Sequence, residues 1–158
     1  MSMRHRYGTQ YIVRAAVDSG TEIRLGDLLF LDTDDAKPAS SEAWVTDLVT
    51  TQSNFNNHFL GIALAEHPAN SGAVSDFPVD ISPLSVYEMD CDSEVHELGD
   101  LLTPIKASGN ALVPNKLRKT TTTAAGCARC LRRDPVSRTT VLVRFQSAYW
   151  GSNNAAQQ

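Results

Sequence analysis

The chain has 158 residues, of which 42% are hydrophobic and 20% charged, a composition typical of one globular domain or of one domain built from two similar halves. No stretch approaches the roughly 20 apolar residues that cross a bilayer, and no apolar signal segment follows the basic start, Met1–Gly8. We therefore expect a protein that is made in the cytoplasm and has no membrane partner. The odd number of cysteines, 3, favours free thiols in a reducing compartment.

Taken in chain order, the predicted elements are mostly strands. Residues 11–17 alternate in polarity, which predicts a strand, and residues 28–31 predict a short buried strand before an acidic loop over 32–41. Apolar side chains near helical spacing predict one short amphipathic helix within 44–58. Further strands are predicted at 59–65, 79–81, 86–91, 101–104, 126–132 and 139–145. The sequence therefore predicts a mainly all-β fold.

One pentapeptide occurs twice in the sequence. Leu-Gly-Asp-Leu-Leu stands at 25–29 and returns unchanged at 98–102. Because glycine adopts positive φ easily and aspartate caps nearby backbone donors, each copy predicts a turn, one at Gly26 and Asp27 and the other at Gly99 and Asp100.

The repeat divides the chain into two parts. We expect a single β-rich domain over 10–150, built from two similar units at about 10–70 and 79–146 that share one core. An N-terminal arm, 1–9, precedes this domain, and a flexible tail, 151–158, follows it.

Charge is distributed unevenly along the chain. Residues 1–105 hold 5 Lys+Arg and 17 Asp+Glu, a net charge of −12, whereas residues 106–158 hold 9 and 1, a net charge of +8. A basic third could bind nucleic acid, here through Arg129, Arg132, Arg133 and Arg138. No aromatic-basic motif of a nucleic-acid module is present. We therefore favour packing of the two oppositely charged parts against each other, within or between subunits, and expect no nucleic-acid partner.

The CxxC at Cys127 and Cys130 invites a redox or zinc interpretation. A redox pair needs a helix start that lowers the thiol pKa, but this segment precedes a strand-like run. A zinc site would need two more ligands, for which the candidates are Cys91, His96, His67 and His58. Side chains three apart in a strand point to opposite faces, so we expect ordinary cysteines, with no metal and no cofactor.

Enzymatic function finds little support in the sequence. The acidic run Asp32–Asp35 lacks the glycine and the distal glutamate of a calcium loop, and predicts a solvated turn. A metal-dependent hydrolase using Asp32, Asp34 and His96 remains an alternative, but no Gly-x-Ser-x-Gly turn or Gly-rich phosphate loop is present. We expect a protein that is not an enzyme and has no catalytic residue.

The run from Arg14 to Leu28, Arg-Ala-Ala-Val-Asp-Ser-Gly-Thr-Glu-Ile-Arg-Leu-Gly-Asp-Leu, resembles the opening of small β-clip domains. Similar openings occur in the capsid decoration (cement) proteins of tailed phages. The resemblance covers about residues 10–65, and the second Leu-Gly-Asp-Leu-Leu unit more loosely. It implies a β-clip or small β-barrel-like fold without catalytic residues.

The same resemblance implies a function. We expect a homotrimer on the virion surface that bridges neighbouring copies of the major capsid protein and stabilises the shell. The basic arm with Arg4, Arg6 and Tyr7, and the aromatic pair Tyr149 and Trp150, are the expected contacts with capsid or subunits. The alternative is a small β-clip module that binds a carbohydrate or another small ligand.

Overall fold

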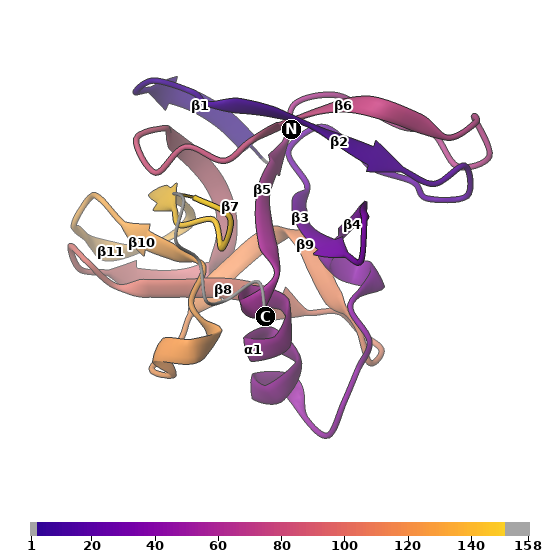
Figure 1. The fold of residues 1–158 in the computed structure, drawn as a ribbon. Helices are drawn as coiled ribbons and strands as arrows, with labels where there is room; N and C mark the ends of the chain where they lie inside the picture. Colours follow the sequence, from indigo (N-terminus) through magenta and orange to yellow (C-terminus); the bar gives the residue numbers. More distant parts are fainter. Residues whose placement is uncertain (1–2, 151–158) are drawn as a thin grey trace.

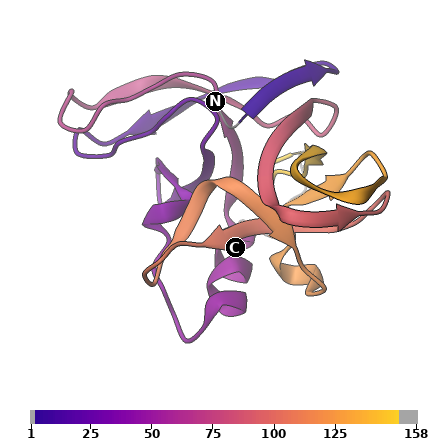
Figure 2. The same ribbon diagram turned by 180° about the vertical axis from the view of Figure 1, so that it is seen from behind.

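The computed structural model describes residues 3–150. These residues form two closed five-stranded β-barrels (Figures 1 and 2). The predicted mainly all-β, small-barrel fold is confirmed, and one α-helix is present within the range where it was predicted. The predicted tail, 151–158, lies outside the described residues.

The first barrel follows the order β2-β4-β3-β5-β6. The ten-residue helix α1 (Leu48–Asn57) connects β4 to β5 after a 3-10 turn, η1 (Ala39–Ser41). The helix begins where the side chain of Asp47 accepts a hydrogen bond from the Thr50 N–H at 2.8 Å, which satisfies one of its free amides. The strands are β2 (Ile12–Val17), β3 (Leu28–Asp32), β4 (Asp35–Pro38), β5 (Phe59–Ala63) and β6 (Val74–Asp80).

The second barrel follows the order β7-β9-β8-β10-β11 and closes through the β7–β11 pairing. A 3-10 turn, η2 (Thr123–Ala125), takes the place that α1 has in the first barrel. The strands are β7 (Val86–His96), β8 (Leu101–Lys106), β9 (Leu112–Lys119), β10 (Ala128–Cys130) and β11 (Asp134–Phe145).

The described part of the predicted arm is a strand. β1 (Met3–Tyr7) pairs antiparallel with the first residues of β7, with Arg4 opposite Glu88. The backbone ladder and the charge attraction between these two side chains hold this segment on its own second barrel. Over its described residues, the predicted N-terminal arm is therefore an added edge strand of the second barrel.

The two barrels are equivalent at the level of strand register. Leu28 pairs with Ile62 in the first barrel, and Leu101 pairs with Arg129 at the same place in the second. The parallel pairs also correspond, with Ala16 opposite Asp35 in one barrel and Asp90 opposite Lys116 in the other. The internal repeat therefore extends over whole barrels. Strand β6 belongs to the first of them, whereas the sequence placed residues 79–80 in the second unit.

The repeated pentapeptide forms the same turn in each barrel. Gly26 has φ 90° and Gly99 has φ 89°, a backbone conformation that favours glycine. Oδ2 of the aspartate accepts from the N–H three residues earlier, at 2.9 Å from Arg24 to Asp27 and at 2.9 Å from Glu97 to Asp100. The predicted chemistry of glycine and aspartate therefore explains why both turns have one geometry.

A chain of aromatic rings joins the two barrels. Phe55 of α1 lies 5.6 Å from Phe59 of β5, and Phe59 lies 5.7 Å from Phe145 of β11, measured between ring centroids. Tyr87 of β7 continues the chain at 6.3 Å from Phe145. All four side chains are buried within one apolar cluster that also holds the interior of the second barrel. One apolar cluster therefore joins the outer face of the first barrel to the interior of the second, whereas the interior of the first barrel forms a separate cluster.

A buried carboxylate fixes the segment between the barrels. Asp80, at the end of β6, accepts hydrogen bonds from the Tyr11 N–H at 3.0 Å, the Ser82 N–H at 2.9 Å and the Tyr87 hydroxyl at 2.6 Å. Burial and the nearby carboxylate raise the pKa of Tyr87, which keeps its hydroxyl a donor. This network ties the start of β2 to the start of β7.

Candidate functional site

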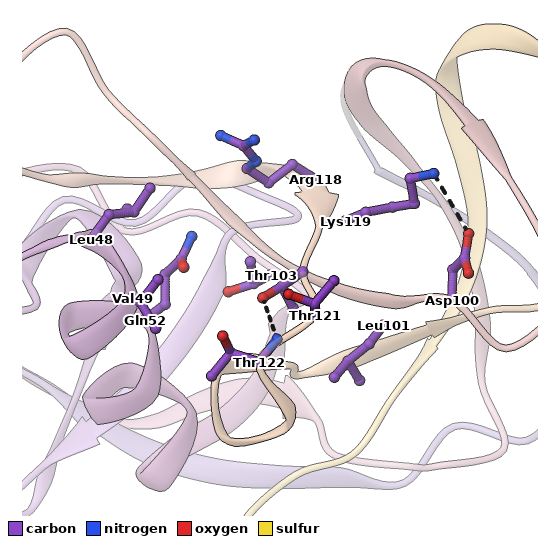
Figure 3. A pocket seen from close by; sticks show the side chains of 11 residues that line it. Leu48, Val49, Gln52, Asp100, Leu101, Thr103, Arg118, Lys119, Thr121 and Thr122 are labelled. Atoms are coloured by element: carbon purple, nitrogen blue, oxygen red, sulfur yellow. Dashed lines mark hydrogen bonds and ion pairs between the residues drawn. The ribbon is translucent and has the colours of Figure 1, made fainter.

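The second barrel carries a cavity of about 480 Å³ beside α1 (Figure 3). Gln52 of the helix reaches across and donates to the Pro104 carbonyl at 2.7 Å. The Thr103 hydroxyl of β8 is buried without a hydrogen-bond partner among the described residues. Arg118 and Thr121 lie on the other side of the cavity. The wall is therefore rich in hydroxyl, amide and cationic groups.

A second cavity, also of about 480 Å³, lies on the outer face of β10 and β11 and shares Leu101 with the first. Two arginines stand side by side here, because Arg129 pairs with Arg144 across the two strands. Like charges directly opposite in a ladder destabilise a sheet. Within residues 3–150 neither guanidinium forms an ion pair with a carboxylate, and the one contact of Arg129 is a 3.0 Å bond to the Gly99 carbonyl.

Most other cations of the basic third are paired within the chain. Arg132 and Arg138 both bind the buried Asp134, each at 3.1 Å, and Arg133 binds Glu97 at 2.9 Å. Three of the four arginines considered for nucleic-acid binding therefore form ion pairs with carboxylates of the described residues, and Arg129 is the exception.

The expected contact residues at the chain ends differ from one another. Arg4 and Arg6 both form ion pairs with Glu88 of β7, at 3.5 and 2.9 Å, and these pairs lie within their own chain. Tyr7 is 57% exposed. Tyr149 and Trp150 are half-buried against the core of the first barrel, and the Trp150 ring stands edge-on to Tyr11 at 5.3 Å. Burial raises the pKa of Tyr149.

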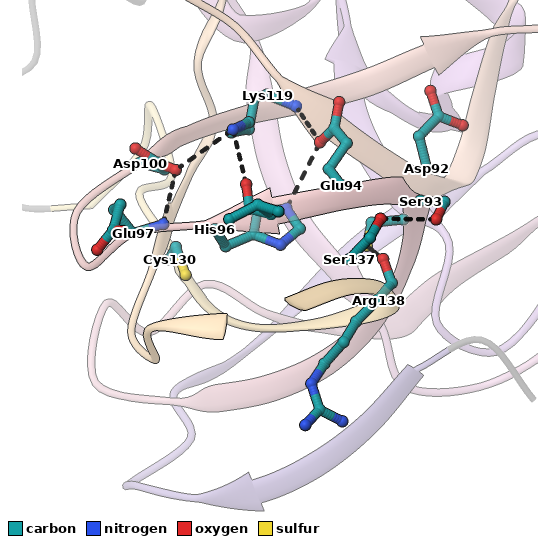
Figure 4. Close-up of polar contacts among 12 residues, drawn as sticks. Asp92, Ser93, Glu94, His96, Glu97, Asp100, Lys119, Cys130, Ser137 and Arg138 are labelled. Carbon is teal, nitrogen blue, oxygen red and sulfur yellow. Dashed lines mark hydrogen bonds and ion pairs between the residues drawn. The ribbon is translucent and has the colours of Figure 1, made fainter. Parts of the chain in front are cut away.

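The two repeat-turn aspartates have different surroundings. Asp27 is buried, and its Oδ1 has no hydrogen-bond partner among the described residues. Burial raises the pKa of this carboxyl. Asp100 is partly exposed and lies 3.9 Å from Lys119 Nζ (Figure 4). Both aspartates keep the turn, but only Asp27 is buried.

The three cysteines are buried thiols. Burial raises the pKa of Cys91 and of Cys127 to about 12 and also raises the pKa of Cys130. The Cys130 thiol donates to the Arg132 carbonyl at 2.9 Å. High pKa values disfavour the thiolate, which is the form that binds zinc or attacks a disulfide.

No group of three or more His, Cys, Asp and Glu side chains in residues 3–150 is arranged to hold a metal ion. Asp32 and Asp34 belong to the β3–β4 connection, where Lys37 binds Asp32 at 2.6 Å. His96 ends β7 in the other barrel and lies buried, 3.5 Å from Glu94 Oε2 (Figure 4). The metal-hydrolase residues named from the sequence are therefore not brought together.

No family model and no curated protein matches this chain. No helix among residues 3–150 is both long and apolar enough to span a bilayer. Sequence reasoning missed Thr103, Arg118 and Arg144, which line the two cavities. The excess of Lys and Arg after residue 105 was the available sequence signal for a basic surface. Only the fold reveals which of these side chains form ion pairs among the described residues.

Proposed function

We propose that this chain is a structural virion protein that binds the outside of a tailed-phage capsid as an oligomer. In this role it bridges major capsid proteins and stabilises the shell, and it has no enzymatic activity. The observation that carries the proposal is the pair of equivalent barrels, held together by one apolar cluster between them. A lattice presents many similar sites, and a rigid unit with two similar halves can turn modest contacts into strong overall binding.

The binding partner that we propose rests on the resemblance of residues 14–28 to phage decoration proteins. Those residues run from β2 through the Gly26 turn to the start of β3. The expected partners are the major capsid protein and other copies of the chain, as a homotrimer. The protein would be made in the host cytoplasm and then reside on the virion surface.

Exposed apolar side chains support a contact surface near the start of the chain. Tyr7 is 57% exposed and Leu84 is 61% exposed. The Gly8 backbone packs directly on the Leu84 carbonyl, so the two side chains belong to neighbouring segments. Grouped exposed apolar residues are typical of interaction sites. We assign this surface, rather than Arg4 and Arg6, to the shell contact.

The test is binding of purified variants to expanded shells of the major capsid protein encoded with this chain. Tyr7→Ser with Leu84→Ser should lower shell affinity about 10-fold or more, because interface anchors of this type contribute over 1 kcal/mol each. Leu98→Ser with Val136→Ser is the matched control, since these side chains are 71% and 68% exposed elsewhere. Equal binding by both double variants would reject the assigned surface.

One observation favours the alternative, a ligand- or carbohydrate-binding module. The cavity beside α1 combines Gln52 and Arg118 with the Thr103 hydroxyl, which has no partner within residues 3–150, and such groups hydrogen-bond sugar hydroxyls. Its described lining includes no aromatic side chain on which a sugar ring could stack. A panel of immobilised glycans tests this function: binding that Thr103→Val abolishes would support it, and no binding to the panel would reject it.

A further inference from the structure

The outer face of the first barrel is a docking face within the chain. Leu28, Phe30 and Ile62 project from β3 and β5 and are buried, at 0%, 6% and 1% exposure. They belong to the same apolar cluster as the interior of the second barrel. The two barrels are therefore held together by this surface of the first.

The equivalent surface of the second barrel is buried at Thr103 but exposed at its two arginines, Arg129 and Arg144. Strand register places Leu101 where the first barrel has Leu28, Thr103 where it has Phe30, and Arg129 where it has Ile62. Arg144 replaces Asp80 in the same way. We call Leu101, Arg129 and Arg144 the basic face. This face lines the cavity on β10 and β11, and both arginines are exposed.

We propose that the basic face of one copy binds the first barrel of a second copy, head to tail. The contact within the chain sets the pattern: Phe59 of β5 packs on Phe145, beside Tyr87, in the second barrel, and Leu28, Phe30 and Ile62 belong to the same apolar cluster. The first barrel uses its outer face for the contact within the chain. The equivalent face of the second barrel is therefore available to a second copy of the chain. Head-to-tail contacts of this kind close into rings when the rotation between copies allows it.

The same comparison of strand register identifies the end of the first barrel that would receive the basic face of another copy. We call it the acceptor end. Tyr87 corresponds to Val13, and Phe145 corresponds to Ile81. Beside Val13 the exposed Tyr11, at 56%, stands against Trp150. Guanidinium groups stack on aromatic rings, so the arginines of the basic face find suitable chemistry at this end.

The charges of the two barrels favour the same arrangement. Residues 12–80 hold 3 Lys+Arg and 11 Asp+Glu, a net charge of −8, while residues 86–145 hold 9 and 7, a net charge of +2. A basic face on an acidic barrel is attractive, whereas two basic faces against each other would repel. Complementary charge therefore favours head-to-tail over face-to-face association.

Sedimentation equilibrium of the full chain at about 50 mM salt tests the contact. The wild type should form complexes larger than one 17.2 kDa chain. Arg129→Glu with Arg144→Glu should raise the dissociation constant about 100-fold, as should Tyr11→Ser on the acceptor end. Lys106→Glu with Lys116→Glu, which makes the same charge change elsewhere on the second barrel, should leave the complexes intact.

Mixing the two defective proteins separates head-to-tail association from other modes. A protein with a reversed basic face keeps its acceptor end, and the Tyr11→Ser protein keeps its basic face. An equimolar mixture should therefore form a dimer of twice 17.2 kDa, with one intact contact. If the Glu variant fails to fold by circular dichroism, Arg129→Ala with Arg144→Ala takes its place.

A wild-type chain that stays monomeric at about 100 µM would overturn the proposal. The proposal would equally fail if the mixture stayed monomeric or if the Lys106 and Lys116 control dissociated to the same extent. Leu84 lines the same cavity as the basic face, so the two contacts are told apart by the arginine variants, which leave Tyr7 and Leu84 unchanged. A protein that assembles head to tail and does not bind shells would reject the proposed function and leave this contact standing.

Discussion

Removing the Phe59 ring should weaken both barrels at once. Its side chain is 0% exposed and lies between Phe55 and Phe145, at 5.6 and 5.7 Å. Deletion of a fully buried phenylalanine side chain costs about 3–5 kcal/mol, through lost transfer energy and the cavity left behind. We expect Phe59→Ala to lower the free energy of unfolding by about 4 kcal/mol. For a chain of this size that lowers Tm by about 8–16 °C.

Urea unfolding followed by circular dichroism measures this change. A double-mutant cycle with Phe145→Ala tests the physical reason, because aromatic partners in contact couple by about 0.5–1.5 kcal/mol. Phe77→Ala is the control, since Phe77 is buried in the separate cluster inside the first barrel and should add independently to Phe145→Ala. Strict additivity of Phe59→Ala with Phe145→Ala would refute a core that couples the barrels.

Three further predictions concern the carboxylates and the repeated turn. Asp80→Ala should lower the free energy of unfolding by about 3–5 kcal/mol, because it leaves three hydrogen-bond donors unsatisfied. In the same urea assay, Asp76→Ala, at an exposed position, should change the free energy of unfolding by less than about 0.5 kcal/mol. Burial raises the pKa of Asp27, so the folded protein holds this proton more tightly than the unfolded chain does. The stability of the wild type relative to Asp27→Asn should therefore fall as the pH rises from the unfolded-state pKa, about 3.9, through the raised native pKa. Urea titrations over this pH range that show a constant or rising stability difference would contradict this prediction. Gly99→Ala should cost about 1–2 kcal/mol because of its φ of 89°, whereas Gly20→Ala, with open space around it and no left-handed backbone, should be near neutral by thermal melting.

The sequence predicted those elements in which local chemistry agrees with the final fold. The two Gly-Asp turns need only positive φ and a short acceptor, and α1 needs only its apolar spacing and Asp47. Strand β4 was expected as loop because Asp35 and Pro38 disfavour strands, and the neighbouring strand β3 overrides that preference. The same holds for β9, which contains Pro114 and was not predicted.

The candidate surfaces depend on contacts between distant residues, which the sequence alone does not reveal. Arg4 and Arg6 resemble a free basic arm until the β1–β7 pairing places both beside Glu88. Arg129 and Arg144 become neighbours only through the β10–β11 register. The charge asymmetry indicated a basic surface, but pairing within the chain decides which cations remain available.

Binding of the purified wild-type chain to shells tests the proposed function most directly. Expanded shells of the major capsid protein encoded with this chain would be mixed with it and sedimented, and the bound copies counted by quantitative gel. We predict saturable binding at a fixed ratio to the capsid protein, with shells that melt at a higher temperature when decorated. Absence of binding, or binding that leaves the melting temperature of the shell unchanged, would contradict a cement role.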